Sequence, residues 1–145
     1  MIEVVYFDTS ALAKWYLHEA RSEEVEDYIR TRGPVAISTL TVVEMRSLLA
    51  RRRRERDIDA KMEMAIFGTF EDDIREGHLR QHPIEDTTIM GASHLLAAMN
   101  AHPLRTLDAL HLSIAREIQA TIIATADHVM ARAGRAMEFS VVRFD

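Results

Sequence analysis

Three acidic residues of this chain follow short apolar segments of the kind that form buried strands. Asp8 directly follows one such segment, Asp127 lies two residues after another, and Glu44 lies in the first turns of a helix predicted after a third. In open α/β sheets, ligands collect at the carboxyl ends of the strands, and helices that follow strands begin there. Chain direction therefore places these three side chains at one edge of the predicted sheet. A fourth, Asp108, lies in the first turn of a helix that leads into a strand, and chain direction alone does not place it there.

This set of side chains suggests metal-assisted chemistry. Carboxylates gathered in one partly buried pocket repel each other, and some take up protons unless a cation compensates. Oxygen ligands without His or Cys suit hard cations such as Mg²⁺ or Mn²⁺. A cation held in this way polarises a phosphoryl oxygen and lowers the pKa of a bound water, so phosphodiester hydrolysis is the natural use of such a site.

Each acid also has a structural explanation. Asp8 and Asp127 could cap helices, which contributes about 1 kcal/mol each. Glu44 ends the stretch Thr41–Glu44, which matches a capping box. Asp108, near a helix start, would gain from the helix macrodipole. Taken singly, these explanations are as good as a functional one; it is the set of four that favours a site.

Short apolar strands alternate with helices from one end of the chain to the other. Strands that are apolar almost throughout are typical of parallel sheets buried on both faces. The alternation predicts an α/β fold, namely a single three-layer domain over residues 1–145 with a mostly parallel central sheet of four to five strands flanked by helices. The predicted strands are residues 2–7, 35–37, 79–82, 121–125 and 139–144; helices are predicted after Thr9, over Ser22–Arg32, after Ile37, over about 57–76, and along two apolar stripes, one of Ile89, Ala92, Leu96 and Met99 and one of Leu107, Leu110, Ile114 and Ile118.

The composition excludes several classes of protein. The 145 residues are 48% hydrophobic, enough to bury a core, so a disordered chain is excluded. The absence of cysteine excludes disulfide scaffolds and thiolate metal sites and fits a reducing compartment. The net charge of −5 is not that of a polycation that coats nucleic acid. With no basic leader and no apolar run near the roughly 18 residues of a membrane span, we expect a cytoplasmic protein with no membrane partner.

The four acids with their neighbours resemble the PIN-domain family, and within it the VapC-type toxins of bacterial toxin–antitoxin pairs. The correspondence runs along nearly the full chain, although residues 57–100 contain no motif to align. Each motif alone is weak, but all of them in this order make a specific signal. The matching stretches are Tyr6–Leu12, Val43–Met45, Leu104–Leu112 and Ala124–Asp127.

The resemblance implies an endoribonuclease toxin that requires Mg²⁺, with Mn²⁺ as a substitute, and that is held inactive by a cognate antitoxin protein. It also leads us to expect a homodimer. Asp8, Glu44, Asp108 and Asp127 match the family's acidic quartet. Asp8 and Asp108 would be direct metal ligands, and Asp127 would complete the site directly or through water. Glu44 would hold a metal-bound water or orient the attacking one.

Further residues near the quartet could support it. Thr9, Ser10 and Thr125 could hydrogen-bond the carboxylates or a scissile phosphate, and Arg105 could touch a phosphate. His111 lies one helical turn after the third acid and could face the same site. For this histidine, a packing or supporting role is a better interpretation than metal ligation.

An arginine run and an apolar region are two further candidates for contact with RNA or with a protein partner. Arg51–Arg54, with Arg46 and Arg56, could contact RNA phosphates. However, four successive residues spread around a helix, so a solvated helix end that complements the dipole is the favoured interpretation. An antitoxin is expected to dock on the region of Leu48, Leu49, Ile66 and Phe67.

Two other functions stay open on the residues alone. One is a phosphatase or phospho-receiver, which needs an Asp after a strand as nucleophile or acceptor; the Asp-x-Asp pattern of such nucleophiles is absent, since Thr9 and Ser10 follow Asp8. The other is a non-catalytic binding module in which the acids only cap helices.

Overall fold

Five parallel strands form the central sheet of the computed structural model, which describes residues 3–145. The order across the sheet is β3-β2-β1-β4-β5, so the first strand lies at the centre. The prediction of an α/β fold with a parallel sheet is confirmed, with every strand pair parallel. Ile2, which was included in the first predicted strand, lies outside the described residues. The strands are β1 (Val5–Phe7), β2 (Val35–Ser38), β3 (Leu79–His82), β4 (Ile122–Thr125) and β5 (Ser140–Arg143).

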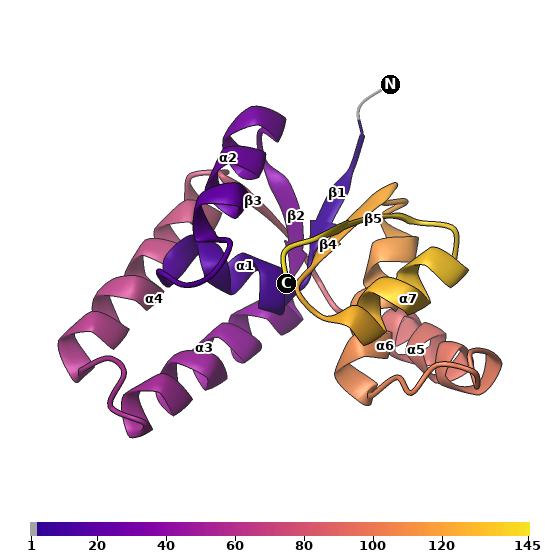
Figure 1. The fold of residues 1–145 in the computed structure, drawn as a ribbon. Helices are drawn as coiled ribbons and strands as arrows, with labels where there is room; N and C mark the ends of the chain where they lie inside the picture. The colour runs from indigo at the N-terminus through magenta and orange to yellow at the C-terminus, as the bar shows by residue number, and fades with distance from the viewer. Residues whose placement is uncertain (1–2) are drawn as a thin grey trace.

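The helices cover both faces of the sheet, which gives the predicted three layers (Figure 1). One group lies on one side of the sheet: α1 (Thr9–Tyr16), α2 (Ser22–Arg32), α3 (Thr39–Arg54) and α4 (Ala60–Arg75). The other group lies on the opposite side: α5 (Asp86–Ala98), α6 (Thr106–Glu117) and α7 (His128–Ala136). Within residues 3–145, no helix combines the length and apolar character that crossing a bilayer requires.

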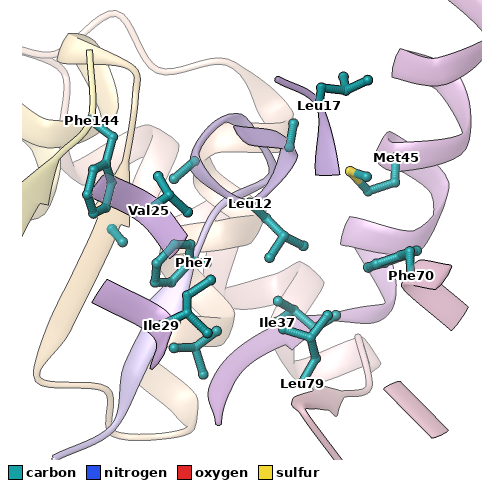
Figure 2. Close-up of a cluster of buried hydrophobic side chains, with 14 of the residues drawn as sticks. Phe7, Leu12, Leu17, Val25, Ile29, Ile37, Met45, Phe70, Leu79 and Phe144 are labelled. Carbon is teal, nitrogen blue, oxygen red and sulfur yellow. The ribbon is translucent and has the colours of Figure 1, made fainter. Parts of the chain in front are cut away.

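The alternation of side chains along β1 divides the core in two. Val5 and Phe7 pack into the larger cluster, beneath α1 to α4, whereas Tyr6 packs into the other cluster with Leu112 of α6 and Ile123 of β4. Successive side chains of a strand point to opposite faces, which is why a fully apolar strand suits this central position. Figure 2 shows the larger cluster, in which side chains from distant segments surround Phe7.

Two helices differ from the prediction, α4 in where it begins and α5 in which face it buries. The helix expected over 57–76 begins at Ala60, because Asp59 caps it and accepts a hydrogen bond from the Met62 N–H at 2.8 Å. In α5, Ile89 and Leu96 of the predicted buried stripe are 53% and 39% exposed.

The contact between α5 and α6 explains which face of α5 is buried. A Cβ atom on Gly91 would lie 2.5 Å from Ser113 Oγ, so the missing side chain lets α6 approach closely. Ser113 Oγ in turn donates to the carbonyl oxygen of Thr88 at 2.8 Å. Close approach through small residues therefore decides the orientation of α5, which buries Leu95 and leaves Ile89, Met90 and Leu96 exposed.

Candidate active site

The four acids of the predicted quartet lie where strands of the sheet end. Asp8 follows β1 and is the N-cap of α1, and Asp127 follows β4 and is the N-cap of α7. Glu44 lies in the second turn of α3, which begins directly after β2. Asp108 is the third residue of α6. Since α6 ends just before β4, at the amino edge of the sheet, and runs antiparallel to the strands, its first turn lies at the carboxyl edge with the other acids.

A cavity of about 760 Å³ opens at this edge. Glu44, Asp108 and Asp127 line it together with Arg105. Asp8 is buried, with 4% of its surface exposed. The structure therefore brings three of the acids to one cavity, and the fourth is joined to them through hydroxyl groups.

Asp8 is held on both carboxylate oxygens. Its Oδ1 atom accepts hydrogen bonds from Ser10 Oγ at 2.7 Å and from the Ala11 N–H at 3.1 Å. Its Oδ2 atom accepts from Thr125 Oγ1 at 2.5 Å. Burial raises the pKa of Asp8, and the charge of His111 and these hydrogen bonds offset that rise only in part.

The two hydroxyl groups that hold Asp8 also connect the ends of β1 and β4. Thr125 Oγ1 accepts from the Asp127 N–H at 3.0 Å, and Ser10 Oγ accepts from the Ala126 N–H at 3.0 Å. Each hydroxyl therefore donates to the carboxylate of Asp8 and accepts from the backbone next to Asp127. This pair of bonds fixes the two strand-end acids relative to one another.

Asp108 and Asp127 lie close enough for their charges to interact. Burial raises the pKa of Asp108; the Arg105 N–H lowers it by donating to Oδ2 at 3.1 Å, and the charge of Asp127 raises it further. Asp127 Oδ1 accepts from the Val129 N–H at 2.9 Å. Among the described residues, one carboxylate oxygen of each aspartate therefore has no hydrogen bond from the protein.

Glu44 has a different environment. Its Oε1 atom accepts from Thr9 Oγ1 at 2.6 Å and is 2.5 Å from His111 Nε2. Burial acts to raise the pKa of Glu44, but the hydrogen bond and charge of His111, together with the Thr9 hydroxyl, lower it below its usual value. The carboxylate of Glu44 is thus kept ionised by the protein itself.

Three of the four acids interact with the N-termini of helices, as the capping alternatives predict. Asp8 and Asp127 do cap helices, and Asp108 accepts from the Arg105 N–H at the start of α6. The capping box predicted at Thr41–Glu44 is wrong, because α3 begins earlier and its box is formed by Ser38 and Thr41. Glu44 is thus the one member of the quartet with no role in capping a helix of the described chain.

His111 connects Glu44 to the sheet. It is 4% exposed, and its Nδ1 atom is 2.6 Å from the hydroxyl of Tyr6. That hydroxyl donates to Ser38 Oγ at 3.0 Å. Sequence reasoning placed His111 near the acids by its spacing but missed Tyr6 and Ser38, since nothing in the sequence shows which strand residue faces α6.

The donor set fits a hard cation, although its side chains are not arranged around one. Within residues 3–145, no three carboxylate or imidazole groups already converge at metal-ligand separations. The available donors are nonetheless carboxylate oxygens, two of them free of protein hydrogen bonds, and burial raises the pKa of both Asp8 and Asp108. Oxygen donors whose negative charge lacks a partner are those that Mg²⁺ and Mn²⁺ favour.

Two arginines of the run, and most of the apolar region expected to bind the antitoxin, are engaged within the fold. Arg52 pairs with Glu19 at 2.8 Å and Arg53 with Glu63 at 2.8 Å, which agrees with a structural interpretation of the run. The docking region predicted around Leu49 is wrong as a surface, because it packs into the core. Leu49 and Phe67 are buried, and Leu48 and Ile66 are partly buried against the core.

A comparison with protein-family models gives one match, the PIN domain, over residues 5–136. The chain belongs to the PIN domain family. The match confirms the predicted family resemblance. The matched residues include all four acids at the edge of the sheet. A comparison with curated proteins gives no match.

Solved structures show the same fold over the whole PIN domain. The chain is similar to VapC20 of Mycobacterium tuberculosis, a sarcin–ricin loop cleaving toxin, with a TM-score of 0.74, 20% identity, and 96% of this chain and 98% of that one covered. It is also similar to VapBC of Salmonella typhimurium bound to DNA, with a TM-score of 0.69, 13% identity, and 99% of each chain covered. VapBC2 of Rickettsia felis, bound to a promoter fragment, gives a TM-score of 0.67, 14% identity, and coverage of 98% and 99%. At these identities the likeness shows the fold.

Proposed function

We propose that this PIN domain is a Mg²⁺-dependent endoribonuclease and acts as the toxin of a toxin–antitoxin pair. The observation that carries the proposal is the meeting of Glu44, Asp108 and Asp127 at one cavity, with Asp8 linked to them through Thr125. Membership of the PIN family and similarity in fold to VapC-type toxins support it.

Asp8, Asp108 and Asp127 would hold the cation, Mg²⁺ or Mn²⁺ in its place. Burial raises the pKa of Asp8 and Asp108, so a positive charge would relieve an electrostatic cost that the fold leaves in place. When bound, the ion would supply Lewis-acid activation of a phosphoryl oxygen and of a water molecule. Ser10 and Thr125 orient the carboxylate of Asp8 by their hydrogen bonds, and so would support this role.

Glu44 and Arg105 would act on the water and the phosphate. The carboxylate of Glu44 is ionised and lines the cavity, so it would orient the attacking water and accept its proton. Thr9 holds that carboxylate through its hydroxyl. Arg105 is exposed at the same cavity, where its guanidinium would bind the scissile phosphate.

The phosphatase alternative is less well supported by the geometry. A nucleophilic or phosphate-accepting aspartate must reach its substrate. Asp8 is buried and accepts hydrogen bonds on both oxygens. Its arrangement favours a role as a ligand held in place over one as a nucleophile.

The proposed partners are RNA, a cognate antitoxin and a second copy of the chain. Two of the solved structures with this fold are VapBC complexes with DNA. For pairing of two copies, α5 offers the exposed apolar side chains Ile89, Met90 and Leu96. Mass measurement in solution tests the dimer; a homodimer that Met90→Lys separates supports pairing through α5, and a monomeric wild type contradicts it.

The activity is tested with purified protein and three RNA probes: ribosomal RNA, transfer RNA and a synthetic sarcin–ricin stem-loop. We expect cleavage with Mg²⁺ or Mn²⁺, none with a chelator, and none by Asp8→Asn. Asp59→Asn is the matched control, because Asp59 caps α4 through the Met62 N–H as Asp8 caps α1 through Ala11. Asn is as good an N-cap as Asp, so both variants should fold. Hydrolysis of a small phosphate ester without RNA cleavage would favour the phosphatase alternative, and binding of RNA with no cleavage would favour the binding module.

A further inference from the structure

One buried polar chain leads from the sheet to the cavity. Ser38 at the end of β2 bonds to the Tyr6 hydroxyl, the hydroxyl bonds to His111, and His111 bonds to Glu44. Ser38 and Tyr6 are fully buried and His111 is 4% exposed, whereas Glu44 reaches the cavity. The chain thus ends on the one acid of the quartet that caps no helix.

The chemistry of these groups fixes one proton. An ionised carboxylate can only accept hydrogen bonds, so His111 Nε2 carries a hydrogen and donates it to Glu44 Oε1. The hydroxyl oxygen of Tyr6 lies 2.6 Å from Nδ1, so each ring nitrogen has a hydrogen-bond partner. Bonds at both nitrogens hold the imidazole plane, and the imidazole in turn holds the carboxylate.

The position of Glu44 depends on this contact. Glu44 is partly buried and lies on α3 between the exposed Val43 and the buried Met45, and its long side chain has torsions that the helix does not fix. Its Oε1 atom accepts from Thr9 Oγ1 and from His111 Nε2, and Glu44 takes no part in the capping box of α3. Without His111, one of the two bonds that restrain the carboxylate is lost.

We propose that His111 is a positioning residue that holds the carboxylate of Glu44 at the edge of the cavity, in the orientation needed to act on the attacking water. This inference rests on the proposed function, because it assigns His111 a role in that reaction. His111 acts through Glu44, not on the substrate or the cation.

Two substitutions at this position separate the two ends of the ring. The amide nitrogen of Asn falls near the place of Nδ1, so His111→Asn can keep a bond to Tyr6 but cannot reach Glu44. The amide nitrogen of Gln falls near the place of Nε2, so His111→Gln can donate to Glu44. Ser113→Ala is the structural control, since it removes a buried hydrogen bond of the same helix, from Ser113 Oγ to the carbonyl oxygen of Thr88, that lies outside the bonded chain from Ser38 to Glu44.

Steady-state cleavage of a labelled stem-loop RNA gives the first readout. We expect His111→Asn to lower kcat by about 10-fold to 100-fold, with KM little changed. This is less than the roughly 10²-fold to 10⁴-fold of a removed acid–base group, because Thr9 still holds the carboxylate. His111→Gln should recover most of kcat, and Ser113→Ala should lose thermal stability as His111→Asn does but keep kcat. In a Glu44→Ala background, His111→Asn should cause no further loss. Equal and additive losses for His111→Asn with and without Glu44 would overturn the positioning role.

Proton NMR of the imidazole gives a second readout that does not need activity. A hydrogen-bonded Nε2 proton of a buried histidine should give a resolved, slowly exchanging signal in the wild type, and Glu44→Ala should shift or remove it. A signal that is absent in the wild type or unmoved by Glu44→Ala overturns the inference. If the wild type shows the signal but cleaves no RNA with either cation, the proposed function is overturned, and the catalytic role of His111 with it. The contact between His111 and Glu44 is established in that case.

Discussion

Glu44 and Asp108 line the same cavity but are treated by the protein in opposite ways. Glu44 meets a histidine and a threonine hydroxyl, and its pKa is lowered in spite of burial. Asp108 is half-buried beside Asp127 and receives one backbone hydrogen bond, and its pKa is raised. Glu44 pairs directly with His111, whereas at Asp108 the charges of His111 and Arg105 only partly offset burial and the charge of Asp127.

This difference divides the quartet into two parts. Asp8 belongs with Asp108, because burial raises its pKa although three donors hold it. The protein offsets the negative charge of the aspartates only in part, so a cation bound beside them would be stabilising. Glu44 is paired with His111 and needs no cation. We therefore assign cation binding to the aspartates and the handling of water to Glu44.

Of Glu44 and Asp108, the aspartate is expected to give the larger effect, in the variant Asp108→Asn. Loss of a charged ligand removes transition-state stabilisation of several kcal/mol, so cleavage should fall by about 10²-fold to 10³-fold. The rise in Tm that millimolar Mg²⁺ gives the wild type should disappear as well. Thermal melting with and without Mg²⁺, alongside the cleavage assay, measures both. An undiminished Mg²⁺ effect in this variant would contradict the assignment of the aspartate side.

Glu44→Gln should have a smaller and different effect. Gln keeps the length of the side chain but cannot accept the proton, so cleavage should fall by about 100-fold, the lower end of what a positioned acid–base group contributes. The rise in Tm with Mg²⁺ should remain, because this side does not hold the ion. If Glu44→Gln and Asp108→Asn lose the Mg²⁺ effect equally, the division into two parts fails.

The two sides should also differ in how stability depends on pH. The lowered pKa of Glu44 means that its ionised form stabilises the fold above its unfolded value of 4.5, and that this contribution is lost as pH falls through the lower folded value. Replacing a hydrogen bond to a charged group by one between neutral groups removes about 1 kcal/mol. Urea unfolding of Glu44→Gln should therefore show this loss at pH 7 and a smaller difference from the wild type near pH 4. A constant difference at both pH values would show that ionisation of Glu44 does not contribute.

The sequence was sufficient to place most of this site, and the reason lies in the strands. Asp8 and Asp127 directly follow apolar segments, and parallel strands bring their ends to one edge. The same rule could have placed Asp108, since a helix that leads into a strand runs antiparallel to it and must begin at the carboxyl edge. The position of Asp108 thus follows from the order of α6 and β4 along the chain.

What the sequence could not supply is the packing between elements. The contact of Tyr6 with His111 depends on which face of β1 meets α6, and an apolar strand buried on both sides gives no sign of that. The buried stripe of α5 was assigned wrongly at Ile89 because periodicity does not register the close approach at Gly91. The box at Thr41–Glu44 was misplaced because Ser38, the last residue of β2, already caps α3.

The smallest expected effect is on the stability of the protein without metal, and it tests the comparison most directly. Because the folded pKa of Asp108 is raised, its ionised form costs stability as pH rises above the usual value of 3.8. Asp108→Asn removes the charge and keeps an oxygen for the Arg105 N–H, so at pH 7 the metal-free Tm should increase by about 1–3 °C, where about 1 kcal/mol corresponds to roughly 4 °C.

The control for this increase is Asp86→Asn, which removes an exposed carboxylate from the first turn of α5. There the negative charge interacts favourably with the helix dipole, so its loss should lower Tm slightly. If Tm rises for Asp108→Asn and falls for Asp86→Asn, the position of the carboxylate in the fold decides the change in Tm, not the loss of an acid as such. If Tm decreases for Asp108→Asn at pH 7, the protein itself already offsets the charge of Asp108. A bound cation would then relieve no electrostatic repulsion at that residue.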